Sequence, residues 1–457
     1  MDIISNIIQQ ICNFVWRLPM IILLVGTHIF LTFRLKFPQR KILTAIKLSM
    51  TTDNGSKGDV SQFGALMTSL AATIGTGNII GVATAVSLGG PGAIFWCWLT
   101  GLFGIATKYG EGLLAVKYRI KTPDGEMAGG PMYALERGVG IKWLAVLFSI
   151  LTAFAAFGIG NTVQANAISE NVCSLTDGHI NTVLCKTIVG LIITTITAIV
   201  IFGGVKSIAR FCSKLIPFMA TFYIIGCIYI LCVNNQYIIP AVKWILSDAF
   251  STKSAVGGIA GTAIMMTMRY GIARGLFSNE SGMGSAPIVA AAAQSKNPVR
   301  QALVTSTATF WDTIIICSLT GLVIVSSLLA FPDIDIKNQG MLTIEAFGKI
   351  PYIGTPLLSV GIITFAFSTI LGWGYYGEKA IEYLIGKKYV KHYRILWVIM
   401  VMVGSILNLE IVWSLADLMN ALMAIPNLVS LILLSGVMAK ETQYYLWNNH
   451  LDESSDE

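Results

Sequence analysis

The feature that most constrains this chain is a series of long apolar segments that recurs along its whole length. We find about eleven of them, each close to or above the ~18 residues that a helix needs to cross a bilayer. Charged residues make up only 12% of the 457 positions and hydrophobic residues 54%, whereas a soluble domain carries roughly 25% charged residues. The sequence therefore predicts an all-α polytopic membrane protein. The approximate spans are 15–34, 62–88, 92–116, 143–168, 184–203, 212–233, 255–293, 301–331, 355–380, 394–412 and 416–438.

The segments between these spans alternate between loops rich in Lys and Arg and loops with few basic residues. Examples of the second kind are "SLGGPG" and "FPDIDIKNQG". Because cytoplasmic loops carry an excess of Lys and Arg, we expect a cell-membrane protein with its N-terminus outside. The net charge of +7 then belongs to these loops, and no basic patch with interleaved aromatic residues indicates nucleic-acid binding. The acidic tail "HLDESSDE" is predicted to be cytoplasmic and disordered. The basic loops are 34–60, 117–142, 204–214, 294–300 and 381–394.

Two spans are interrupted by polar, glycine-rich sequence. The second contains "IGTGN" at 74–78 and the seventh contains "RGLFSNESGMGSAP" at 274–287. They lie five spans apart, so the two run through the membrane in opposite directions. Discontinuous helices at corresponding positions of two oppositely oriented halves are typical of secondary transporters with inverted repeats. We therefore expect broken helices at 62–88 and 255–293. The predicted parts are an extra helix with a basic loop (1–59), two five-helix repeats (60–233 and 255–438) and a tail (439–457).

The first interruption is not a dinucleotide fingerprint. Gly81 comes one position too late for the third glycine of that motif, and no strand–helix–strand pattern surrounds it. An unwound stretch exposes backbone groups that are costly in lipid unless they are satisfied. The carbonyls that end the first half-helix can hold a cation, and the N–H groups that open the second can hold a carboxylate.

Other polar residues at membrane depth leave alternatives open. Gln164 in the fourth span suits either a ligand or an interhelical hydrogen bond. Asp312 in the eighth span is a cation ligand, a proton carrier or a hydrogen-bond acceptor between helices. Arg274 and Glu280 either neutralise each other or serve the site, and Glu111 is expected to reach the membrane interface. Ser368 and Thr369, in the ninth span, lie one turn before Trp373 and present hydroxyls that suit a hard monovalent cation.

Two cysteines share the loop between the fourth and fifth spans. Cys173 and Cys185 can form a disulfide if that loop faces an oxidising compartment, and the sequence leaves this open. No enzyme motif such as GxSxG, HExxH or a Walker loop is present, and the four histidines are scattered. We therefore expect no enzyme activity and no cofactor.

Several long motifs carry a family resemblance. "GTGNIIGVATAVSLGGPGAIFWCWLTGLFGIATKYGEGLLAVKYR", "GGPMYALERG", "GNTVQANAI", "RGLFSNESGMGSAP" and "GWGYYGEKA" resemble the alanine or glycine:cation symporter family, over about residues 60–440. The resemblance implies a LeuT-type fold that imports alanine or glycine with sodium. It implies that the substrate carboxylate meets the backbone around Gly75, Thr76 and Gly77, with Gln164 contacting the amino acid and Phe277 and Trp373 capping its side chain.

The resemblance also implies two ion sites. The sodium site would use carbonyls of Ala71, Ile74 and Phe365 and the hydroxyls of Ser368 and Thr369. A second cation site would use Thr73, Asn78 and Ser278. The full set of candidate substrate contacts is Thr73, Gly75, Thr76, Gly77, Gln164, Phe277, Asn279, Thr369 and Trp373.

The sequence therefore predicts a secondary active transporter that imports small neutral amino acids by sodium symport. A proton-coupled symporter, with Asp312 or Glu280 as the carrier, is the alternative within transport. A sensor or channel on the same fold is a further alternative. The expected partners are the amino acid, Na⁺ and the lipid bilayer, and the oligomeric state stays open.

Overall fold

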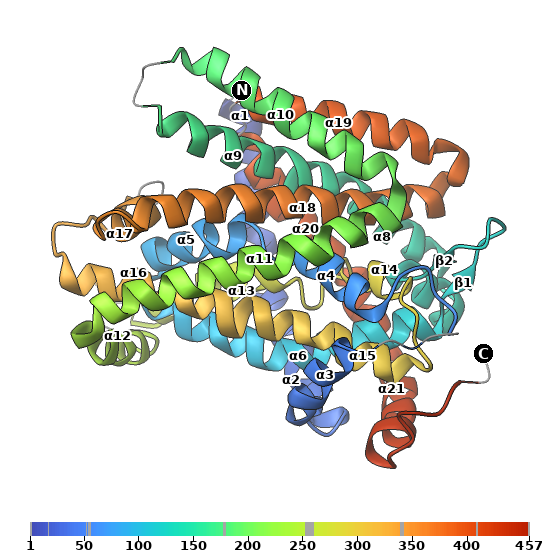
Figure 1. The fold of residues 1–457 in the computed structure, drawn as a ribbon. Coiled ribbons are helices and arrows are strands. Elements are labelled where there is room, and N and C mark those ends of the chain that lie inside the picture. The colour runs from blue at the N-terminus through green and yellow to red at the C-terminus, as the bar shows by residue number, and fades with distance from the viewer. Residues whose placement is uncertain are drawn as a thin grey trace.

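The computed structural model describes residues 2–16, 18–51, 53, 56–176, 180–251, 260–338, 342–407 and 410–455. It is a bundle of helices with one short β-hairpin (Figure 1). The elements are α1 (Asp2–Val15), α2 (Leu18–Arg34), α3 (Ile42–Ser49), α4 (Gln62–Thr73), α5 (Ile80–Gly89), α6 (Ala93–Lys117), β1 (Ile120–Lys121), β2 (Met127–Ala128), α7 (Pro131–Tyr133), α8 (Lys142–Phe157), α9 (Val163–Ser174), α10 (Thr182–Phe202), α11 (Gly204–Val233), α12 (Asn235–Asp248), α13 (Ala260–Asn279), α14 (Pro287–Ala290), α15 (Pro298–Thr309), α16 (Ser318–Ala330), α17 (Leu342–Gly348), α18 (Gly354–Ile385), α19 (Val390–Ile406), α20 (Glu410–Leu433) and α21 (Ser435–Thr442).

Residues with short polar side chains start several of these helices. Ser61 accepts a hydrogen bond from the Gly64 N–H at the start of α4, and Asn181 accepts one from the Val183 N–H at the start of α10. At the start of α15, the Asn297 side chain accepts from the Arg300 N–H. Each cap satisfies a backbone donor that has no partner inside its own helix.

The structure does not confirm the expected number of eleven spans. Among the described residues, six helices are long and apolar enough to cross a membrane, or up to eight if each of two bent pairs is one span. The fourth and eighth predicted spans each run 33 residues, Lys142–Ser174 and Pro298–Ala330. The second span instead divides into α4 and α5, of 12 and 10 residues. The polytopic helical class is confirmed, whereas the count of eleven is not.

Burial separates a central helix from peripheral ones. Of the apolar window of α18, 83% is buried, compared with 33% for α10, α11 and α19. Helix α18 packs against α4, α8, α9 and α11. Exposed apolar side chains line the outside of α10 and α11, including Leu191, Ile199, Phe218 and Ile225. This distribution suits a bundle whose outer faces contact lipid.

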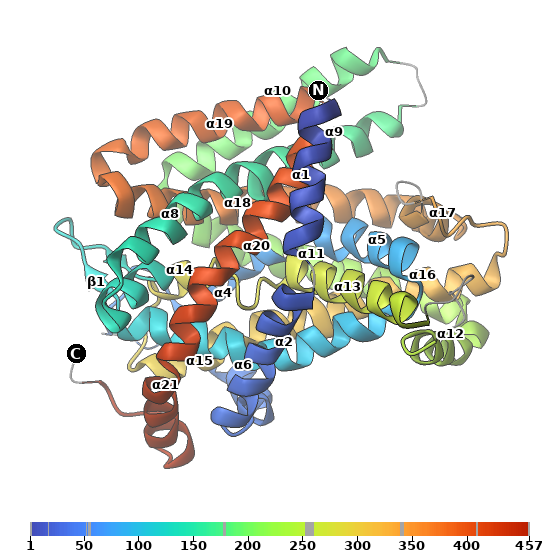
Figure 2. The same ribbon diagram turned by 180° about the vertical axis from the view of Figure 1, so that it is seen from behind.

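The predicted basic loops meet at one end of the bundle, where β1, β2 and the C-terminus lie (Figures 1 and 2). Lys387 pairs with Asp124 at 3.1 Å, and Arg119 donates to the Lys57 carbonyl at 3.1 Å. The expected loop 204–214 is wrong, because these residues form the first turns of α11. Lys and Arg are good helix formers, and Gly204, with φ +67°, allows the sharp turn that precedes them.

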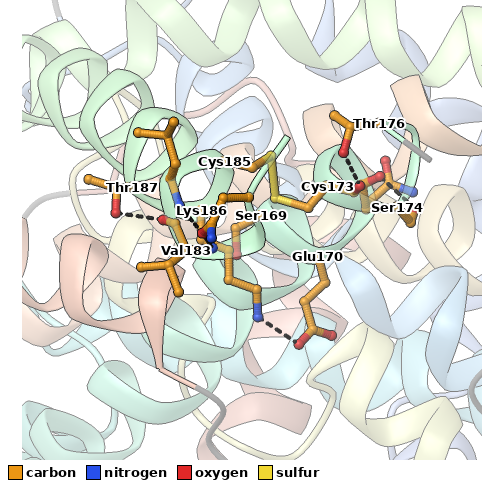
Figure 3. The surroundings of a disulfide bond; sticks show 12 residues. Ser169, Glu170, Cys173, Ser174, Thr176, Val183, Cys185, Lys186 and Thr187 are labelled. Atoms are coloured by element: carbon orange, nitrogen blue, oxygen red, sulfur yellow. Dashed lines mark hydrogen bonds and ion pairs between the residues drawn. A yellow bond between two sulfur atoms is a disulfide. The ribbon is translucent and has the colours of Figure 1, made fainter. Parts of the chain in front are cut away.

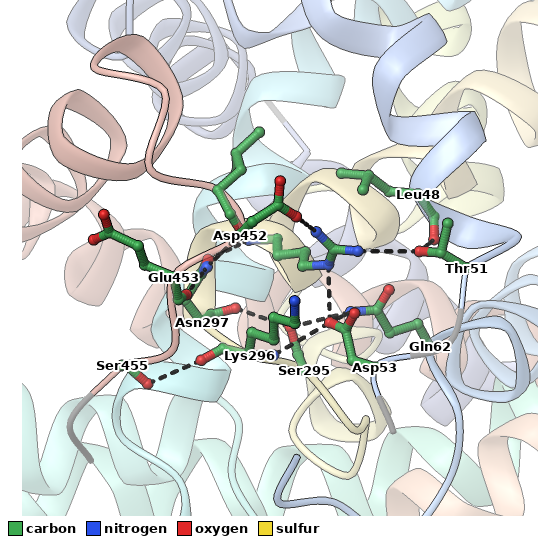
Figure 4. A network of polar contacts seen from close by, with 12 residues as sticks. Leu48, Thr51, Asp53, Gln62, Ser295, Lys296, Asn297, Asp452, Glu453 and Ser455 are labelled. Carbon is green, nitrogen blue, oxygen red and sulfur yellow. Dashed lines mark hydrogen bonds and ion pairs between the residues drawn. The ribbon is translucent and has the colours of Figure 1, made fainter. Parts of the chain in front are cut away.

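The acidic tail was expected to be disordered, and this expectation is wrong for residues 451–455 (Figure 4). Arg300, which is 6% exposed, pairs with both Asp452 and Asp53 at 2.8 Å. The Asn297 side chain donates to the carbonyls of Leu451 and Glu453 at 2.9 Å. Composition did not reveal this because the partners of the tail lie about 150 residues away.

A disulfide joins Cys173 at the end of α9 to Cys185 in α10 (Figure 3). An ion pair between Lys186 and Glu170, at 3.3 Å, lies beside it. The structure therefore resolves the pairing that the sequence left open. In Figure 1 this connection lies at the opposite end of the bundle from β1 and β2.

Candidate functional site

The first candidate element is the break between α4 and α5. Helix α4 ends at Thr73, residues 76–78 form one 3₁₀ turn, and Ile74 and Gly75 between them are extended. The Gly75 N–H donates to Asn78 Oδ1 at 2.9 Å, and it does not close a further helical turn on the Ala71 carbonyl. A Cβ on Gly75 would lie 2.4 Å from Thr369 Oγ1. Glycine is thus required where the break approaches α18.

Four of the five predicted sodium ligands converge between this break and α18. Ser368 Oγ donates to the carbonyl of Ile74 at 3.3 Å and to that of Phe365 at 2.8 Å. Thr369 Oγ1 contacts the same two carbonyls at 3.4 and 3.0 Å. All four residues are buried. Two carbonyls and two hydroxyls form a neutral, all-oxygen group that suits a hard cation.

Gln164 reaches the same break from the neighbouring fourth span. Its Oε1 accepts from the Thr76 N–H at 3.4 Å, while its Nε2 donates to the Ile159 carbonyl at 2.9 Å. Ile159 lies in a π-helical turn, Gly158–Thr162, that joins α8 to α9. Single π-helical turns inside α-helices are frequent at functional sites. Thr76 Oγ1 is buried without a hydrogen-bond partner in the described structure.

Two predicted aromatic walls lie against glycines. A Cβ on Gly77 would lie 3.0 Å from Phe277 Cδ1, and one on Gly160 would lie 2.1 Å from Trp373 Cβ. The Trp373 indole N–H donates to Glu280 Oε1 at 2.8 Å. Trp373 is 1% exposed, and Phe277 is partly buried. Phe277 therefore restricts the space beside the first break, while Trp373 lies against the fourth span.

The second break follows α13 and has a different character. Glu280, Gly282 and Gly284 all have positive φ values, of 55°, 90° and 82°. The N–H groups of Gly282 and Gly284 donate to Glu111 Oε1 at 3.0 and 2.9 Å. Asn427 Nδ2 donates to the same oxygen at 2.7 Å. Figure 2 shows this irregular stretch near the middle of the molecule.

Asp312 lies between the two breaks. Its Oδ1 accepts from Asn78 Nδ2 at 2.6 Å, and its Oδ2 accepts from Ser278 Oγ at 2.9 Å and from Thr313 Oγ1 at 2.7 Å. All four side chains are buried. A carboxylate in this position therefore joins the first break, the end of α13 and the eighth span.

Comparison with known proteins gives the family. A model of the sodium:alanine symporter family matches residues 1–457. The chain belongs to this family. It is 50% identical over 453 residues to the sodium/alanine symporter AgcS of Methanococcus maripaludis, covering 97% of this chain and 98% of that protein. It is 35% identical over 447 residues to the amino-acid carrier protein AlsT of Bacillus subtilis, covering 96% and 92%.

The fold is similar to that of a solved transporter. MhsT in complex with L-phenylalanine matches with a TM-score of 0.57, at 15% identity, over 83% of this chain and 90% of that chain. This likeness supports the LeuT-type architecture that the family resemblance implied. As a member of the sodium:alanine symporter family, the chain is a multi-pass membrane transporter and not an enzyme. The division into repeats at 60–233 and 255–438 stays a prediction.

The structure brings most of the predicted site residues of this family member together, but not all of them. Thr73 Oγ1 donates back to the Ser69 carbonyl of its own helix at 3.2 Å, apart from the group formed by Asn78 and Ser278. Asn279 Nδ2 donates to Thr313 Oγ1 at 3.1 Å, and its Oδ1 accepts from the Ser281 N–H. Asn279 therefore joins helices in this structure. The assignment of each residue to a ligand stays a prediction.

Three charged residues lie differently from expectation. Arg274 pairs with Asp417 at 3.2 Å, while Glu280 accepts from Trp373 and from Ser285 Oγ at 2.5 Å. The pairing of Arg274 with Glu280 is therefore wrong. Glu111 does not reach the interface either, since it is 2% exposed and binds the second break. The sequence offered one signal for this role, which was a carboxylate inside an apolar span.

Proposed function

We propose that this chain imports alanine, and also glycine, together with Na⁺. The observation that carries the proposal is the group of two carbonyls and two hydroxyls at Ile74, Phe365, Ser368 and Thr369. It lies directly beside a half-helix N-terminus with an unpartnered hydroxyl on Thr76. The description of the family and the name of AgcS both give sodium and alanine, which supports these two solutes.

The amino acid takes its place beside the sodium group. Its carboxylate meets the backbone around residues 75–77, where it takes the Thr76 N–H from Gln164 while the Gly75 N–H stays with Asn78, because the positive end of a helix dipole favours an anion. Thr76 Oγ1 and the Gln164 amide supply further polar contacts. Phe277 and Trp373 limit the side chain to the size of a methyl group or a hydrogen atom. Larger side chains such as leucine are excluded by the same rings.

Sodium and the amino acid share one element, the break at residues 74–78. Sodium binding fixes Ile74 against α18, and this fixes the N–H groups that follow Ile74 in the chain. The amino acid therefore binds a pre-ordered backbone at lower entropic cost. By linkage, each solute raises the affinity for the other by the same factor. This reciprocity couples the downhill entry of Na⁺ to the uphill entry of the amino acid.

The proposed orientation places the basic end of the bundle in the cytoplasm, with the N-terminus outside and the C-terminus inside. Two contacts between basic loops and one between a basic loop and the tail support this arrangement. The disulfide at the opposite end suits an oxidising exterior.

The test is uptake of labelled amino acids into proteoliposomes that contain the purified full-length protein. We expect an inward sodium gradient to drive uptake of alanine and glycine and not of leucine. A protonophore should leave this uptake unchanged. Uptake that ignores sodium and is abolished by the protonophore would establish proton coupling instead.

A further inference from the structure

The orientation of the Asn78 side chain is set by Asp312. An ionised carboxylate can only accept hydrogen bonds, whereas an amide presents donors on one side and an acceptor on the other. Asn78 therefore turns its Nδ2 to Asp312 Oδ1, at 2.6 Å. Its Oδ1 is thereby directed back to the Gly75 N–H, at 2.9 Å. Asn78 and Asp312 are both 0% exposed, so water does not compete for these groups.

This orientation determines where helix α4 ends. In a continuing helix the Gly75 N–H would donate to the carbonyl of Ala71, four residues earlier. Here the Gly75 N–H donates to Asn78 Oδ1 instead, so the Ala71 carbonyl does not receive this hydrogen bond. Another proposed sodium ligand, the Ile74 carbonyl, lies within hydrogen-bonding distance of the Ser368 and Thr369 hydroxyls. Both carbonyls are proposed sodium ligands, and both depend on the chain leaving the helix at this point.

Asp312 also connects this arrangement to the second broken helix. Ser278, near the end of α13, donates to the carboxylate at 2.9 Å. Thr313 donates to it at 2.7 Å and accepts in turn from Asn279, the last residue of α13. Asp312 itself lies in a π-helical turn, Phe310–Cys317, between α15 and α16. A hydrogen bond to a charged group is worth about twice a neutral one.

We propose that Asp312 is a positioning residue for the sodium site. It holds the Asn78 amide in the orientation that diverts the Gly75 N–H and leaves the Ala71 carbonyl open to the ion. It transmits the position of α13, through Ser278, to the same site. The inference rests on the proposed sodium symport, and it assigns Asp312 no direct contact with the ion.

The experiment measures the Na⁺ concentration that gives half-maximal alanine uptake in proteoliposomes, for the full-length protein and its variants. Asp312→Asn places an amide donor opposite Asn78. This favours a flipped Asn78 side chain, whose Oδ1 faces position 312 and whose Nδ2 faces the Gly75 N–H. We expect half-saturation by Na⁺ to rise by about tenfold, the value of one lost charge-assisted hydrogen bond. The KM for alanine at saturating Na⁺ should stay within about twofold of wild type, because the Thr76 and Gln164 groups are unchanged.

Exchanging the two residues separates positioning from a general structural effect. In Asn78→Asp with Asp312→Asn, the carboxylate at position 78 accepts from both Gly75 and the introduced amide. We expect this double variant to restore half-saturation by Na⁺ to within about threefold of wild type. Asn78→Asp alone opposes two carboxylates and should lose sodium affinity. The matched control is Ser326→Ala, a buried residue of the same span that bonds its own helix at the Val323 carbonyl.

Three results would overturn the inference. The first is sodium half-saturation within twofold of wild type in Asp312→Asn. The second is failure of the double variant to recover when both proteins are monodisperse. The third is a lower Hill coefficient for Na⁺ in Asp312→Asn, which would show that Asp312 itself binds a second ion.

A further variant keeps the test open if Asp312→Asn does not fold. Ser278→Ala removes one donor and leaves the carboxylate in place, so we expect half-saturation by Na⁺ to rise about threefold. An unchanged value there would also contradict the inference. Wild-type uptake that needs no sodium is a separate result, which removes the proposed function and the inference together.

Discussion

The two broken helices differ in the side chains that hold their backbone N–H groups, which are the neutral amides of Asn78 and Gln164 at the first break and the carboxylate of Glu111 at the second. The break at residues 74–78 contains no charged side chain, and Thr76 Oγ1 within it is buried without a partner in the described structure. The break after α13 has three positive-φ residues, and one side chain from a distant helix, that of Glu111 in α6, accepts from two of its N–H groups. Both breaks interrupt a helix at membrane depth, where unsatisfied groups are costly.

The difference indicates a division of labour. Under the proposed function, the first break offers the Ile74 carbonyl and the Thr76 hydroxyl to solutes, so a bound solute adds contacts to this break. The second is satisfied by the protein itself, mainly through Glu111 and Asn427. It serves as a fixed support that holds Glu280, and through it the Trp373 indole, beside the site.

The largest effect should come from Gly75→Ala at the first break. The added Cβ would lie 2.4 Å from Thr369 Oγ1, so it must displace the Thr369 hydroxyl, which is a proposed sodium ligand. We expect sodium-driven alanine uptake to fall by more than ~100-fold. Gly26→Ala in α2 is the matched control, because its Cβ would meet nothing within 4 Å. Near-normal uptake by Gly75→Ala would show that the first break does not hold the ion.

Glu111→Ala should act on stability more than on solute affinity. It removes the acceptor for two buried N–H groups of the second break, and we expect a loss of about 3 kcal/mol. Thermal unfolding in detergent measures the loss, and Glu111→Gln, which keeps a carbonyl oxygen, should recover part of it. A change in the KM for alanine at an unchanged thermal unfolding temperature would instead place the second break in the substrate site.

Thr76→Val tests the unpartnered hydroxyl of the first break. Valine keeps the shape of threonine, so we expect normal thermal stability. The KM for alanine should rise about tenfold at saturating Na⁺, because one buried hydrogen bond to the substrate is lost. Sodium half-saturation should change less than the KM for alanine. An unchanged KM would remove Thr76 Oγ1 from the substrate site.

The smallest effect should come from Gly77→Ala. Its Cβ would lie 3.0 Å from Phe277 Cδ1, and the partly exposed ring can shift by the few tenths of an ångström required. We expect alanine uptake to fall about threefold. Glycine uptake should fall less, because its side chain needs less of the space that the ring then occupies. Competition of unlabelled glycine against labelled alanine measures the ratio, and a shift toward alanine would contradict this placement.

The sequence predicted the first break well, and it named four residues that the structure brings together there, because the signals are local. "IGTGN" lies within a single apolar run, and Phe365, Ser368 and Thr369 are three to four residues apart, so they share one face of a helix. It predicted the charged residues less well. Glu111 was expected at the interface, a pairing of Arg274 with Glu280 was one of two alternatives, and the tail was expected to be disordered. Each of these depends on a partner far away in the chain.

By itself the sequence determined that this chain crosses a membrane and that two of its helices are interrupted, because composition and local helix-breaking residues act within a single segment. Only the tertiary structure decided which side chains hold each break. Glu111 lies 171 residues from Gly282, and Asp312 lies 234 residues from Asn78. Buried backbone groups are almost always hydrogen-bonded, and the packing of the helices decides which distant side chain lies close enough to be the partner.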